Sequence, residues 1–324
     1  MALLEVANLE IDVVTRGKSF PVVQGVSFTV DSNETLGIVG ESGCGKSLTS
    51  LAIMGLLSET NVRITGGSIR FEGMDLLTLS ANERRAIMGS GMAMIFQEPM
   101  TSLNPVYRVG DQIIESIRQH KNISHAAARD RAVELLTLVQ IANPSERVDS
   151  FPHQMSGGQR QRVMIAMALS CDPKLLIADE PTTALDVTVQ KEVLDLMLDL
   201  QNRMGTAVVL ISHDLGVIAE TCDTVAVMYR GRIVETSSTV KLFERLAHPY
   251  TRGLLKSIPT VDHDVEWLET IPGRVPTLEE TLTGCAFHPR CAMAADICVS
   301  TTPQTTQFRP GHYVQCHFAG QVTS

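Results

Sequence analysis

The sequence predicts an α/β fold with a mostly parallel core sheet, and three patterns along the chain lead to this prediction. Strand-like apolar runs alternate with amphipathic helix-like runs between residues 174 and 229, which is typical of a parallel sheet covered by helices. A glycine-rich turn lies between a short apolar strand and an apolar helix pattern. The residues before this turn alternate apolar and polar side chains, as antiparallel strands do. With 324 residues, 44% apolar and 19% charged, the chain can bury a sizeable core.

The expected elements follow in a defined order. Strands of an antiparallel N-terminal sheet are expected at residues 3–14, 22–30 and 34–40, with a further strand-like stretch at 67–76. Strands of the core sheet are expected at 92–97, 174–179, 207–213 and 224–229, with a closing strand at 231–235. Helices are expected at 47–57, 157–172, 187–205 and 215–222.

Two segments depart from the alternation of strands and helices. Between about residues 98 and 160 the patterns are helical, which predicts a helical insertion into the α/β core. Beyond residue 240 the pattern weakens, Pro, Thr and His become more frequent, and four of the seven cysteines gather. We therefore expect a main domain over residues 1–240 and a small C-terminal, cysteine-containing domain over residues 241–324.

The glycine-rich turn matches the phosphate-binding pattern G-x-x-x-x-G-K-[S/T] without deviation. Backbone N–H groups at a helix N-terminus favour anions, so such a loop can surround the phosphates of ATP. Lys46 can reach the β- and γ-phosphates, and the Ser47 hydroxyl can ligate Mg²⁺. The predicted ATP-binding residues are Gly40, Glu41, Ser42, Gly43, Cys44, Gly45, Lys46 and Ser47.

An apolar strand farther along the chain ends in two acidic residues, Asp179 and Glu180. In P-loop proteins such a strand runs beside the phosphate loop, so Asp179 is expected to reach the Mg²⁺ shell. Glu180, one residue farther, is expected to polarise an attacking water. An apolar strand that ends in acids is common by itself. Together with the phosphate loop it predicts a nucleotide hydrolase.

Further motifs make residues 3–240 resemble the ATP-binding-cassette (ABC) ATPase family. Ser-Gly-Gly-Gln at 156–159 is similar to the LSGGQ signature of that family, with methionine in place of the leucine. Gln97, Asp186 and His213 stand at the places of the Q-loop glutamine, the D-loop aspartate and the switch histidine. With the phosphate loop, these four motifs also occur in the order that is typical of the family.

The resemblance implies a catalytic site shared by two subunits. Each ATP would lie between the phosphate loop of one cassette and the signature loop of the other, whose residues acting in trans are Ser156, Gly157, Gly158 and Gln159. Glu180 would activate water, His213 would hold the γ-phosphate and the water, and Gln97 would couple the site to membrane subunits. The implied Mg²⁺ ligands are Ser47, Gln97 and Asp179.

Two positions of the nucleotide site depart from the family pattern. The place where the family stacks adenine on an aromatic side chain falls near Val13, which leaves Phe20 as an alternative contact or as an ordinary core residue. Cys44 stands inside the phosphate loop. A thiol at a helix N-terminus can have a lowered pKa, whereas the plainer interpretation is a passive small residue.

Longer stretches resemble the ATPase subunits of bacterial oligopeptide and dipeptide importers. They are residues 94–113, residues 179–190, the stretch His248-Pro249-Tyr250-Thr251 and the C-terminal cysteines. The resemblance implies a second ABC ATPase subunit, identical or different, two integral membrane permeases and, indirectly, a periplasmic or extracellular solute-binding protein. It also implies a peripheral position on the cytoplasmic face of the membrane. Similar subunits serve importers of nickel, opines or glutathione, so the transported solute stays open.

Cys285, Cys291, Cys298 and Cys316 are the candidate metal ligands. Four thiolates in one segment suit Zn²⁺ or an iron–sulfur cluster, and the spacing C-x5-C-x6-C-x17-C does not choose between them. The importer resemblance favours a [4Fe–4S] cluster over Zn²⁺, with reduced, unliganded thiols as the remaining alternative. A metal group here would supply folding free energy to a segment that is poor in core residues.

Charge and hydropathy separate the competing functions. The formal net charge of −9 disfavours a nucleic-acid-binding face, because phosphate neutralisation needs clustered Lys and Arg. This argues against the main alternative, a soluble ABC ATPase acting on ribosomes or DNA. No run of eighteen apolar residues occurs, and the first residues alternate like a strand and not like a signal peptide. We therefore expect the chain to remain in the cytoplasm.

Overall fold

A computed structural model describes residues 2–57, 61–97, 102–183, 185–257 and 270–322. The chain divides into two compact units, one of residues 1–30, 34–77 and 210–324 and the other of residues 31–33 and 78–209. Residues 98–101, where the predicted insertion begins, and Ala184 of the D-loop lie outside the described residues. No helix among the described residues is long and apolar enough to cross a membrane. The predicted domain boundary at residue 240 stays a prediction.

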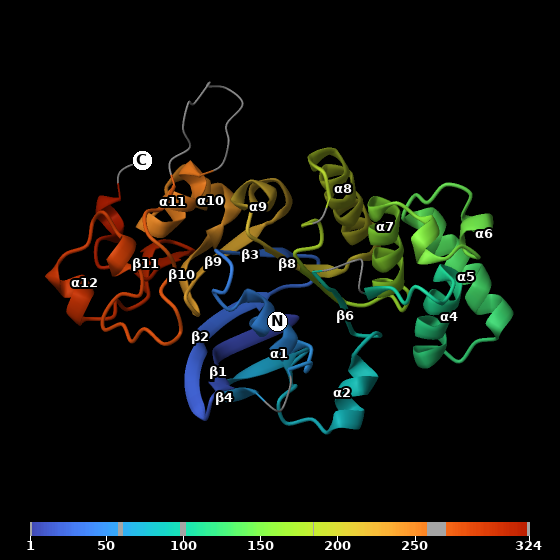
Figure 1. The fold of residues 1–324 in the computed structure, drawn as a ribbon, viewed down its shortest axis with the longest axis horizontal. Helices are drawn as coiled ribbons and strands as arrows, with labels where there is room; N and C mark the ends of the chain where they lie inside the picture. The colour runs from blue at the N-terminus through green and yellow to red at the C-terminus, as the bar shows by residue number, and fades with distance from the viewer. Residues whose placement is uncertain (1, 58–60, 98–101, 184, 258–269, 323–324) are drawn as a thin grey trace. The chain divides into compact units, whose positions relative to one another are not determined.

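The first unit contains an antiparallel sheet in the order β2-β1-β4-β5 (Figure 1). Its strands are β1 (Leu4–Thr15), β2 (Lys18–Val30), β4 (Val62–Phe71) and β5 (Met74–Asp75). Thr15 pairs with Lys18, so β1 and β2 form a hairpin with a two-residue turn, Arg16-Gly17. Both turn residues have positive φ, 52° and 74°, which matches the strand twist in such turns. The predicted antiparallel N-terminal sheet is confirmed.

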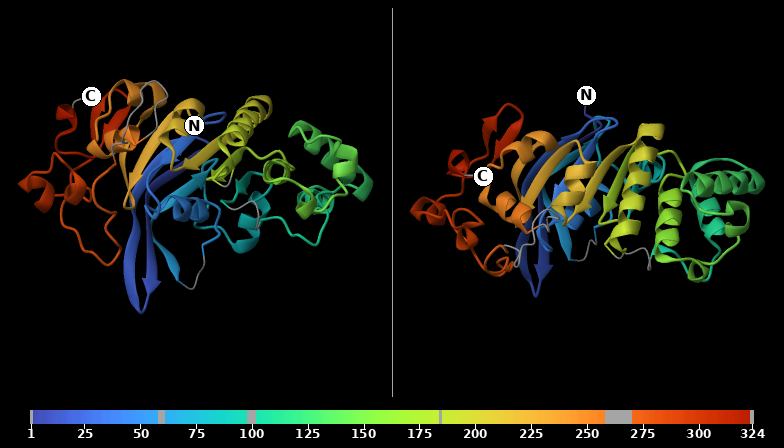
Figure 2. Two further views of the ribbon diagram at one scale, coloured as in Figure 1. Left: turned by 45° about the horizontal axis from the view of Figure 1, so that its top comes forward. Right: turned by 90° about the horizontal axis from the view of Figure 1, so that it is seen from above.

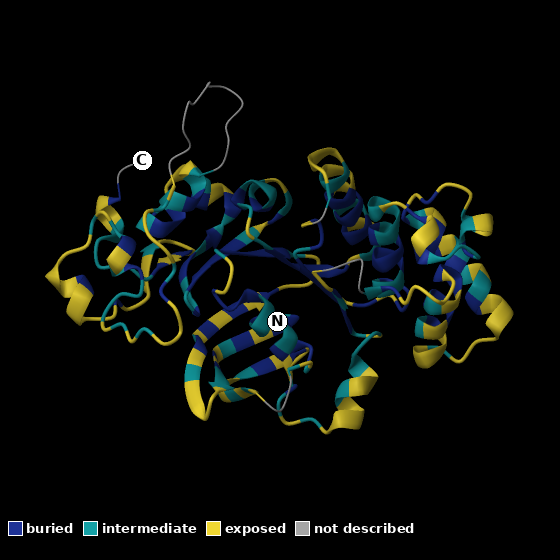
Figure 3. Cartoon of the chain, viewed as in Figure 1, coloured by how far each residue is buried: buried dark blue, intermediate teal, exposed yellow. Residues whose placement is uncertain are grey.

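The same unit carries parallel and antiparallel strands of the core sheet. They are β3 (Thr35–Val39), β9 (Thr224–Tyr229), β10 (Arg232–Ser238), β11 (Thr306–Arg309) and β12 (His312–Val314). Strand β3 pairs in parallel with β9, while β10, β12 and β11 continue the sheet antiparallel. The prediction that residues 34–40 belong to the antiparallel sheet is wrong. All residues of β3 are buried, which is the pattern of a core strand covered on both faces (Figure 3).

Five helices and two 3-10 helices of the first unit are described (Figure 2). They are α1 (Lys46–Ile53), α9 (Leu215–Thr221), α10 (Thr239–Glu244), α11 (Pro249–Lys256) and α12 (Asp296–Ser300), with the 3-10 helices η2 (His288–Arg290) and η3 (Ala319–Gln321). Helix α9 contacts β3, and α10 contacts β9 and β10. Strand β8 (Ala207–Ser212) crosses the division between the two units.

A buried carboxylate ties the C-terminal segment to the core sheet. Glu235 on β10 is 1% exposed and accepts hydrogen bonds from the backbone N–H groups of Ala247, at 2.7 Å, and His248, at 3.0 Å. Nε2 of His312 on β12 lies 2.7 Å from the same carboxylate. A buried carboxylate must be satisfied by such partners. The segment beyond residue 240 is therefore built into the same unit as the phosphate loop.

The second unit joins a parallel strand pair to a group of helices. The pair is β6 (Met92–Ile95) and β7 (Leu175–Asp179). The helices are α2 (Ala81–Ile87), α4 (Val109–His120), α5 (His125–Leu138), α6 (Pro144–Arg147), α7 (Gly157–Ala168) and α8 (Val187–Met204), with the 3-10 helix η1 (Pro152–Gln154). Helices α4, α5 and α7 contact one another, and α7 contacts α8. The predicted helical insertion is confirmed.

Candidate active site

The phosphate loop joins the buried strand β3 to helix α1. A Cβ on Gly40 would lie 2.1 Å from the carbonyl oxygen of Met228, so only glycine allows this close approach to β9. Gly45 is the N-cap of α1 and has φ 105°, a left-handed conformation that favours glycine. The two glycines therefore let the chain turn sharply and present the first turn of α1 at the loop.

The Lys46 ammonium is hydrogen-bonded to carbonyl groups of its own loop. Its Nζ donates to the carbonyl oxygens of Gly40, at 2.7 Å, and Glu41, at 3.2 Å, and the residue is 4% exposed. A buried ammonium needs such acceptors. The carbonyl groups at the start of the loop therefore hold the cation beside the backbone N–H groups that the sequence predicts for phosphate.

Cys44 is a buried loop residue with 1% exposure. Burial raises the pKa of its thiol, and the nearby Lys46 opposes this only in part. Burial thus acts against the alternative of a lowered pKa and favours the plainer interpretation of a small packing residue. The Cys44 carbonyl accepts a hydrogen bond from the N–H of Gly231 at 2.8 Å, which ties the loop to the turn after β9.

The carboxylate of Glu180 is held by two side chains of its own unit. Strand β7 ends at the buried Asp179, and Glu180 follows with φ 47°, an uncommon conformation that often marks functional sites. Its Oε2 accepts hydrogen bonds from Gln97 Nε2 at 3.0 Å and from the Thr183 hydroxyl at 2.9 Å. The parallel pairing of β6 and β7 places both residues beyond the carboxyl ends of neighbouring strands.

Thr183 is a site residue that sequence reasoning missed. The sequence offers only a weak signal for it, a threonine three residues after a catalytic candidate in a loop. Its hydroxyl restricts the Glu180 carboxylate to one orientation together with Gln97. A carboxylate fixed in this way is suited to accept a proton from water.

The signature residues form the start of helix α7. Ser156 is the N-cap, and its hydroxyl accepts from the Gln159 N–H at 3.3 Å while the Gln159 side chain accepts from the Ser156 N–H at 3.0 Å. This reciprocal pair is a capping box. A Cβ on Gly158 would lie 2.7 Å from Cγ1 of Val189 on α8, so glycine allows the two helices to approach. Asp186 caps α8 by accepting from the Val189 N–H at 3.0 Å.

The predicted site residues are divided between the two units. The phosphate loop and His213 belong to the first unit, and Gln97, residues 156–159, Asp179, Glu180 and Asp186 belong to the second. His213 is exposed and follows β8 directly, one residue before the N-cap Asp214 of α9. A sharp turn holds it there, because the Asp214 N–H donates to the Ser212 hydroxyl at 2.9 Å.

The four C-terminal cysteines line one small cavity together with His248, Phe287, His288 and His317. Burial raises the pKa of the thiols of Cys285 and Cys291, and raises that of Cys316 to about 11. All four are free cysteines. As their side chains stand, no group of three or more His, Cys, Asp or Glu among the described residues could hold a metal ion.

Together the fold and the two groups of site residues define a P-loop ATPase of the ATP-binding-cassette class. The family described as "ABC transporter" matches residues 23–183. The family described as "Oligopeptide/dipeptide transporter, C-terminal region" matches residues 234–298. The first match contains the phosphate loop, the signature and Glu180, and the second contains three of the four clustered cysteines.

Curated relatives match nearly the whole chain. A probable peptide ABC transporter ATP-binding protein of Sinorhizobium fredii is 50% identical over 99% of this chain and 96% of its own length. The oligopeptide transport ATP-binding protein AppD of Bacillus subtilis is 49% identical, over 97% and 96%. The dipeptide transport ATP-binding protein DppD of Escherichia coli is 46% identical, over 98% and 97%. The chain belongs to the ABC transporter family and is an ATP-hydrolysing, ATP-binding subunit of its oligopeptide/dipeptide transporter type.

Solved structures show the same fold. The dimeric ATP-binding cassette MJ0796 bound to ADP and Pi has a TM-score of 0.65 with 24% identity, covering 73% of this chain and 98% of its own. The cassette cbiO1 of Clostridium perfringens, part of the transporter complex cbiONQ, has a TM-score of 0.63 with 25% identity, covering 75% and 91%. The predicted fold class is confirmed.

Proposed function

We propose that this chain is the energy-coupling ATPase subunit of a binding-protein-dependent importer for dipeptides or oligopeptides. The observation that carries the proposal is the joint presence of a hydrogen-bonded Glu180 and a C-terminal region of the oligopeptide/dipeptide type. ATP hydrolysis at the site of Glu180 would supply the free energy for import. The C-terminal region is of the type named for oligopeptide and dipeptide transport, and similar relatives are named for peptide transport.

The roles of the site residues follow from their chemistry. Backbone N–H groups of Gly40–Ser47 and the Lys46 ammonium would bind the phosphates. Ser47, Gln97 and Asp179 offer the hard oxygen ligands that Mg²⁺ prefers, and the bound ion would neutralise phosphate charge. Glu180, oriented by Gln97 and Thr183, would take a proton from water, and His213 would hold the γ-phosphate.

Completion of the site is proposed to need a second cassette, identical or different, whose residues Ser156, Gly157, Gly158 and Gln159 act in trans. The N-terminus of α7, where Ser156 is exposed, supports this role, because the dipole of a helix favours an anion such as a γ-phosphate at this end. Two permeases would bind the ATPase pair at the cytoplasmic face of the membrane. The exposed side chains of Val106 and Tyr107, 71% and 57% accessible, support a protein-binding surface at the start of the helical insertion.

The decisive experiment replaces Glu180 by Gln in the assembled transporter. The side chain keeps its shape and loses its basicity, so we expect steady-state ATP hydrolysis to fall by about 100-fold or more while ATP binding is retained. Glu192→Gln is the matched control, because Glu192 lies on the surface of α8 in an ion pair with Arg162. Unchanged hydrolysis in the Glu180 variant would refute the catalytic role.

Uptake by proteoliposomes that contain the binding protein and both permeases tests the solute. ATP-dependent accumulation of labelled dipeptides or oligopeptides is the expected result. Accumulation of nickel, opines or glutathione in place of peptides would keep the ATPase assignment and overturn the peptide assignment. Hydrolysis stimulated by ribosomes or DNA, without any membrane partner, would favour the soluble alternative.

We propose further that Cys285, Cys291, Cys298 and Cys316 hold a [4Fe–4S] cluster. Their convergence on one cavity supports this, since all-thiolate sets are the usual ligands of such clusters. Cysteines ligate such a cluster as thiolates, so its binding would have to displace the protons that burial favours on these thiols. A brown preparation that contains iron and sulfide is expected, and a colourless preparation that contains zinc would overturn the proposal.

A further inference from the structure

An ion pair joins the C-terminal segment to the phosphate loop. Arg290 Nη1 lies 2.7 Å from Glu41 Oε2, and its Nη2 lies 3.0 Å from Glu41 Oε1. The Arg290 side chain is 4% exposed and that of Glu41 is 29% exposed. Two parallel N–H···O bonds of this kind fix the carboxylate in direction as well as in position. The side chain of the second loop residue is therefore oriented from outside the loop.

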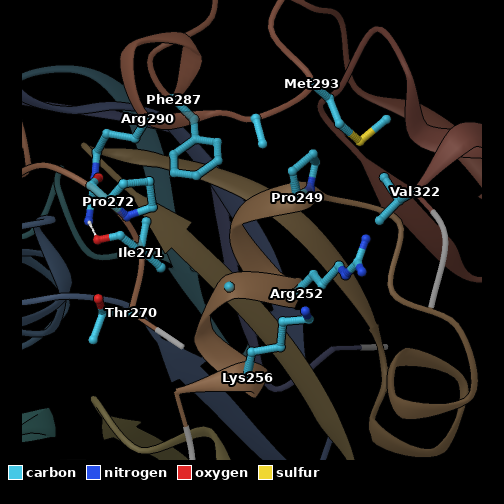
Figure 4. A pocket seen from close by; sticks show the side chains of 12 residues that line it. Pro249, Arg252, Lys256, Thr270, Ile271, Pro272, Phe287, Arg290, Met293 and Val322 are labelled. Atoms are coloured by element: carbon cyan, nitrogen blue, oxygen red, sulfur yellow. Dashed lines mark hydrogen bonds between the residues drawn. The ribbon is translucent and has the colours of Figure 1, made fainter. Parts of the chain in front are cut away.

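Arg290 is itself held firmly on the side of the C-terminal segment. Its Nε donates to the Pro272 carbonyl oxygen at 2.9 Å, and its guanidinium lies 5.9 Å from the centre of the Tyr229 ring. Figure 4 shows Arg290 beside Phe287 and Pro272, while Arg252 and Lys256 line another side of the same cavity. Contacts that do not involve Glu41 therefore hold the guanidinium in the position it needs for the ion pair.

A second contact holds the backbone of the same loop residue. The Glu41 N–H donates to the Tyr250 hydroxyl at 2.9 Å. Tyr250 is fully buried, and its ring lies 4.6 Å from that of Tyr229 and 5.4 Å from that of Phe287. Both the side chain and the backbone of Glu41 are thus fixed by residues beyond position 240.

The position of Glu41 matters for the cation of the loop. The Glu41 carbonyl oxygen accepts a hydrogen bond from Lys46 Nζ at 3.2 Å, next to the Gly40 carbonyl at 2.7 Å. Movement of the Glu41 peptide would therefore displace an acceptor that orients the ammonium. Arg290 is therefore linked to Lys46 through Glu41, which contacts both residues.

We propose that Arg290 is a positioning residue of the ATP site, through which the cysteine-bearing segment fixes the phosphate loop and the orientation of Lys46. The contact of Arg290 with the loop is made to the Glu41 side chain. Arg290 acts through Glu41, and so its loss should weaken ATP binding more than it slows the chemical step. The proposal rests on the assignment of residues 40–47 as the ATP site.

The test compares variants in the assembled transporter. Arg290→Met keeps much of the apolar stem and removes the ion pair, and we expect the Kd for a fluorescent ATP analogue and the KM for ATP to rise roughly 10- to 100-fold, with kcat much less affected. Arg290→Lys keeps the charge without the two-pronged geometry and should lie between Met and wild type. Glu41→Gln, which weakens the pair from the other side, should resemble Arg290→Met.

The matched control is Arg252→Met. Arg252 lines the same cavity but does not take part in the Glu41 ion pair, so its replacement should leave ATP binding unchanged. A double variant, Arg290→Met with Glu41→Gln, should bind ATP no worse than the poorer single variant, since both changes remove one interaction. If Arg290→Met does not assemble, Arg290→Lys and Glu41→Gln decide the outcome.

Wild-type ATP affinity in both Arg290→Lys and Glu41→Gln would overturn the positioning role. A 10- to 100-fold fall of kcat with unchanged KM in Arg290→Met would also overturn it, because this would indicate a role in the chemical step. Failure of the wild-type transporter to bind ATP would instead refute the proposed function, so the two failures can be distinguished.

Discussion

Glu180 combines an uncommon backbone conformation with a carboxylate that is hydrogen-bonded on one oxygen by two neighbours. Left-handed backbone costs free energy for a residue other than glycine, and it persists where the surroundings determine it. The motif identified Glu180 by its place after an apolar strand. Thr183 could not be identified in this way, because no local sequence pattern indicates that a threonine in a loop will hydrogen-bond to a particular carboxylate.

His248 provides a pH test at the scale of one side chain. Burial lowers its pKa from 6.5 to about 4, although the nearby Glu235 opposes this, and its neutral Nδ1 accepts a hydrogen bond from the Tyr250 N–H at 3.0 Å. A depressed folded-state pKa gives stability that is present above pH 6.5 and is lost as the pH falls toward 4. We expect this group to contribute up to about 3 kcal/mol to that loss.

His248→Asn keeps a side-chain acceptor at the N-cap of α11 and removes the titration. The unfolding midpoint in denaturant, measured for both proteins between pH 6.5 and pH 4, checks the expectation. The variant should lose less stability than the wild type over this range. Parallel pH profiles for the two proteins would contradict it.

At the scale of elements, the first turn of α7 serves two purposes. Its capping box stabilises the helix, and Gly158 allows α7 and α8 to approach, so the signature sequence has a local structural reason besides its role toward a partner. Asp186, the D-loop residue, is the N-cap of helix α8. The contact therefore connects the signature to the D-loop of the same subunit.

Gly158→Ala should disturb this helix contact. The new Cβ would meet Val189 Cγ1 at 2.7 Å, which is too close without a shift of one helix, so we expect a loss of about 1–3 kcal/mol in stability together with lower ATPase activity. Adding Val189→Ala removes the clash and should restore much of the stability. Gly157→Ala is the control for stability, because its Cβ would lie 3.6 Å from Leu185, an ordinary contact. The thermal unfolding midpoints of the wild type and the three variants test this. An unchanged midpoint in Gly158→Ala would show that the two helices can accommodate the added methyl group without loss of stability.

The fold was predictable where periodicity is strong and less so elsewhere. Strands β1 and β2 alternate and were predicted, whereas β3 is five buried residues without alternation, and its parallel pairing depends on a partner about 190 residues away. The motifs located both groups of site residues. The Arg290–Glu41 pair could not be predicted, because an arginine next to a cysteine carries no sign of a distant carboxylate.

At the scale of the whole molecule, a short path connects the cysteine cavity to the phosphate loop. Cys291 lines the cavity, and its neighbour in the chain, Arg290, forms the ion pair with Glu41 of the loop. Cys291 directly follows Arg290, and its N–H donates to the His288 carbonyl at 3.3 Å in the turn that carries the arginine. We expect Cys291→Ser to weaken ATP binding in the same direction as Arg290→Met. Cys171→Ser is the control, because Cys171 is buried in the other unit. Titration with a fluorescent ATP analogue measures both variants, and equal affinities would contradict the expected link.

The ion pair also has a consequence for the order in which the protein matures during synthesis. Glu41 and Arg290 are 249 positions apart, so the ribosome completes the loop residue well before it adds the arginine. At about 5–20 residues per second this interval lasts roughly 10–50 s. A nascent chain that already carries every catalytic motif would therefore still lack the contact that fixes its phosphate loop. The capacity to bind ATP tightly should be acquired late, only after Arg290 has been added to the chain.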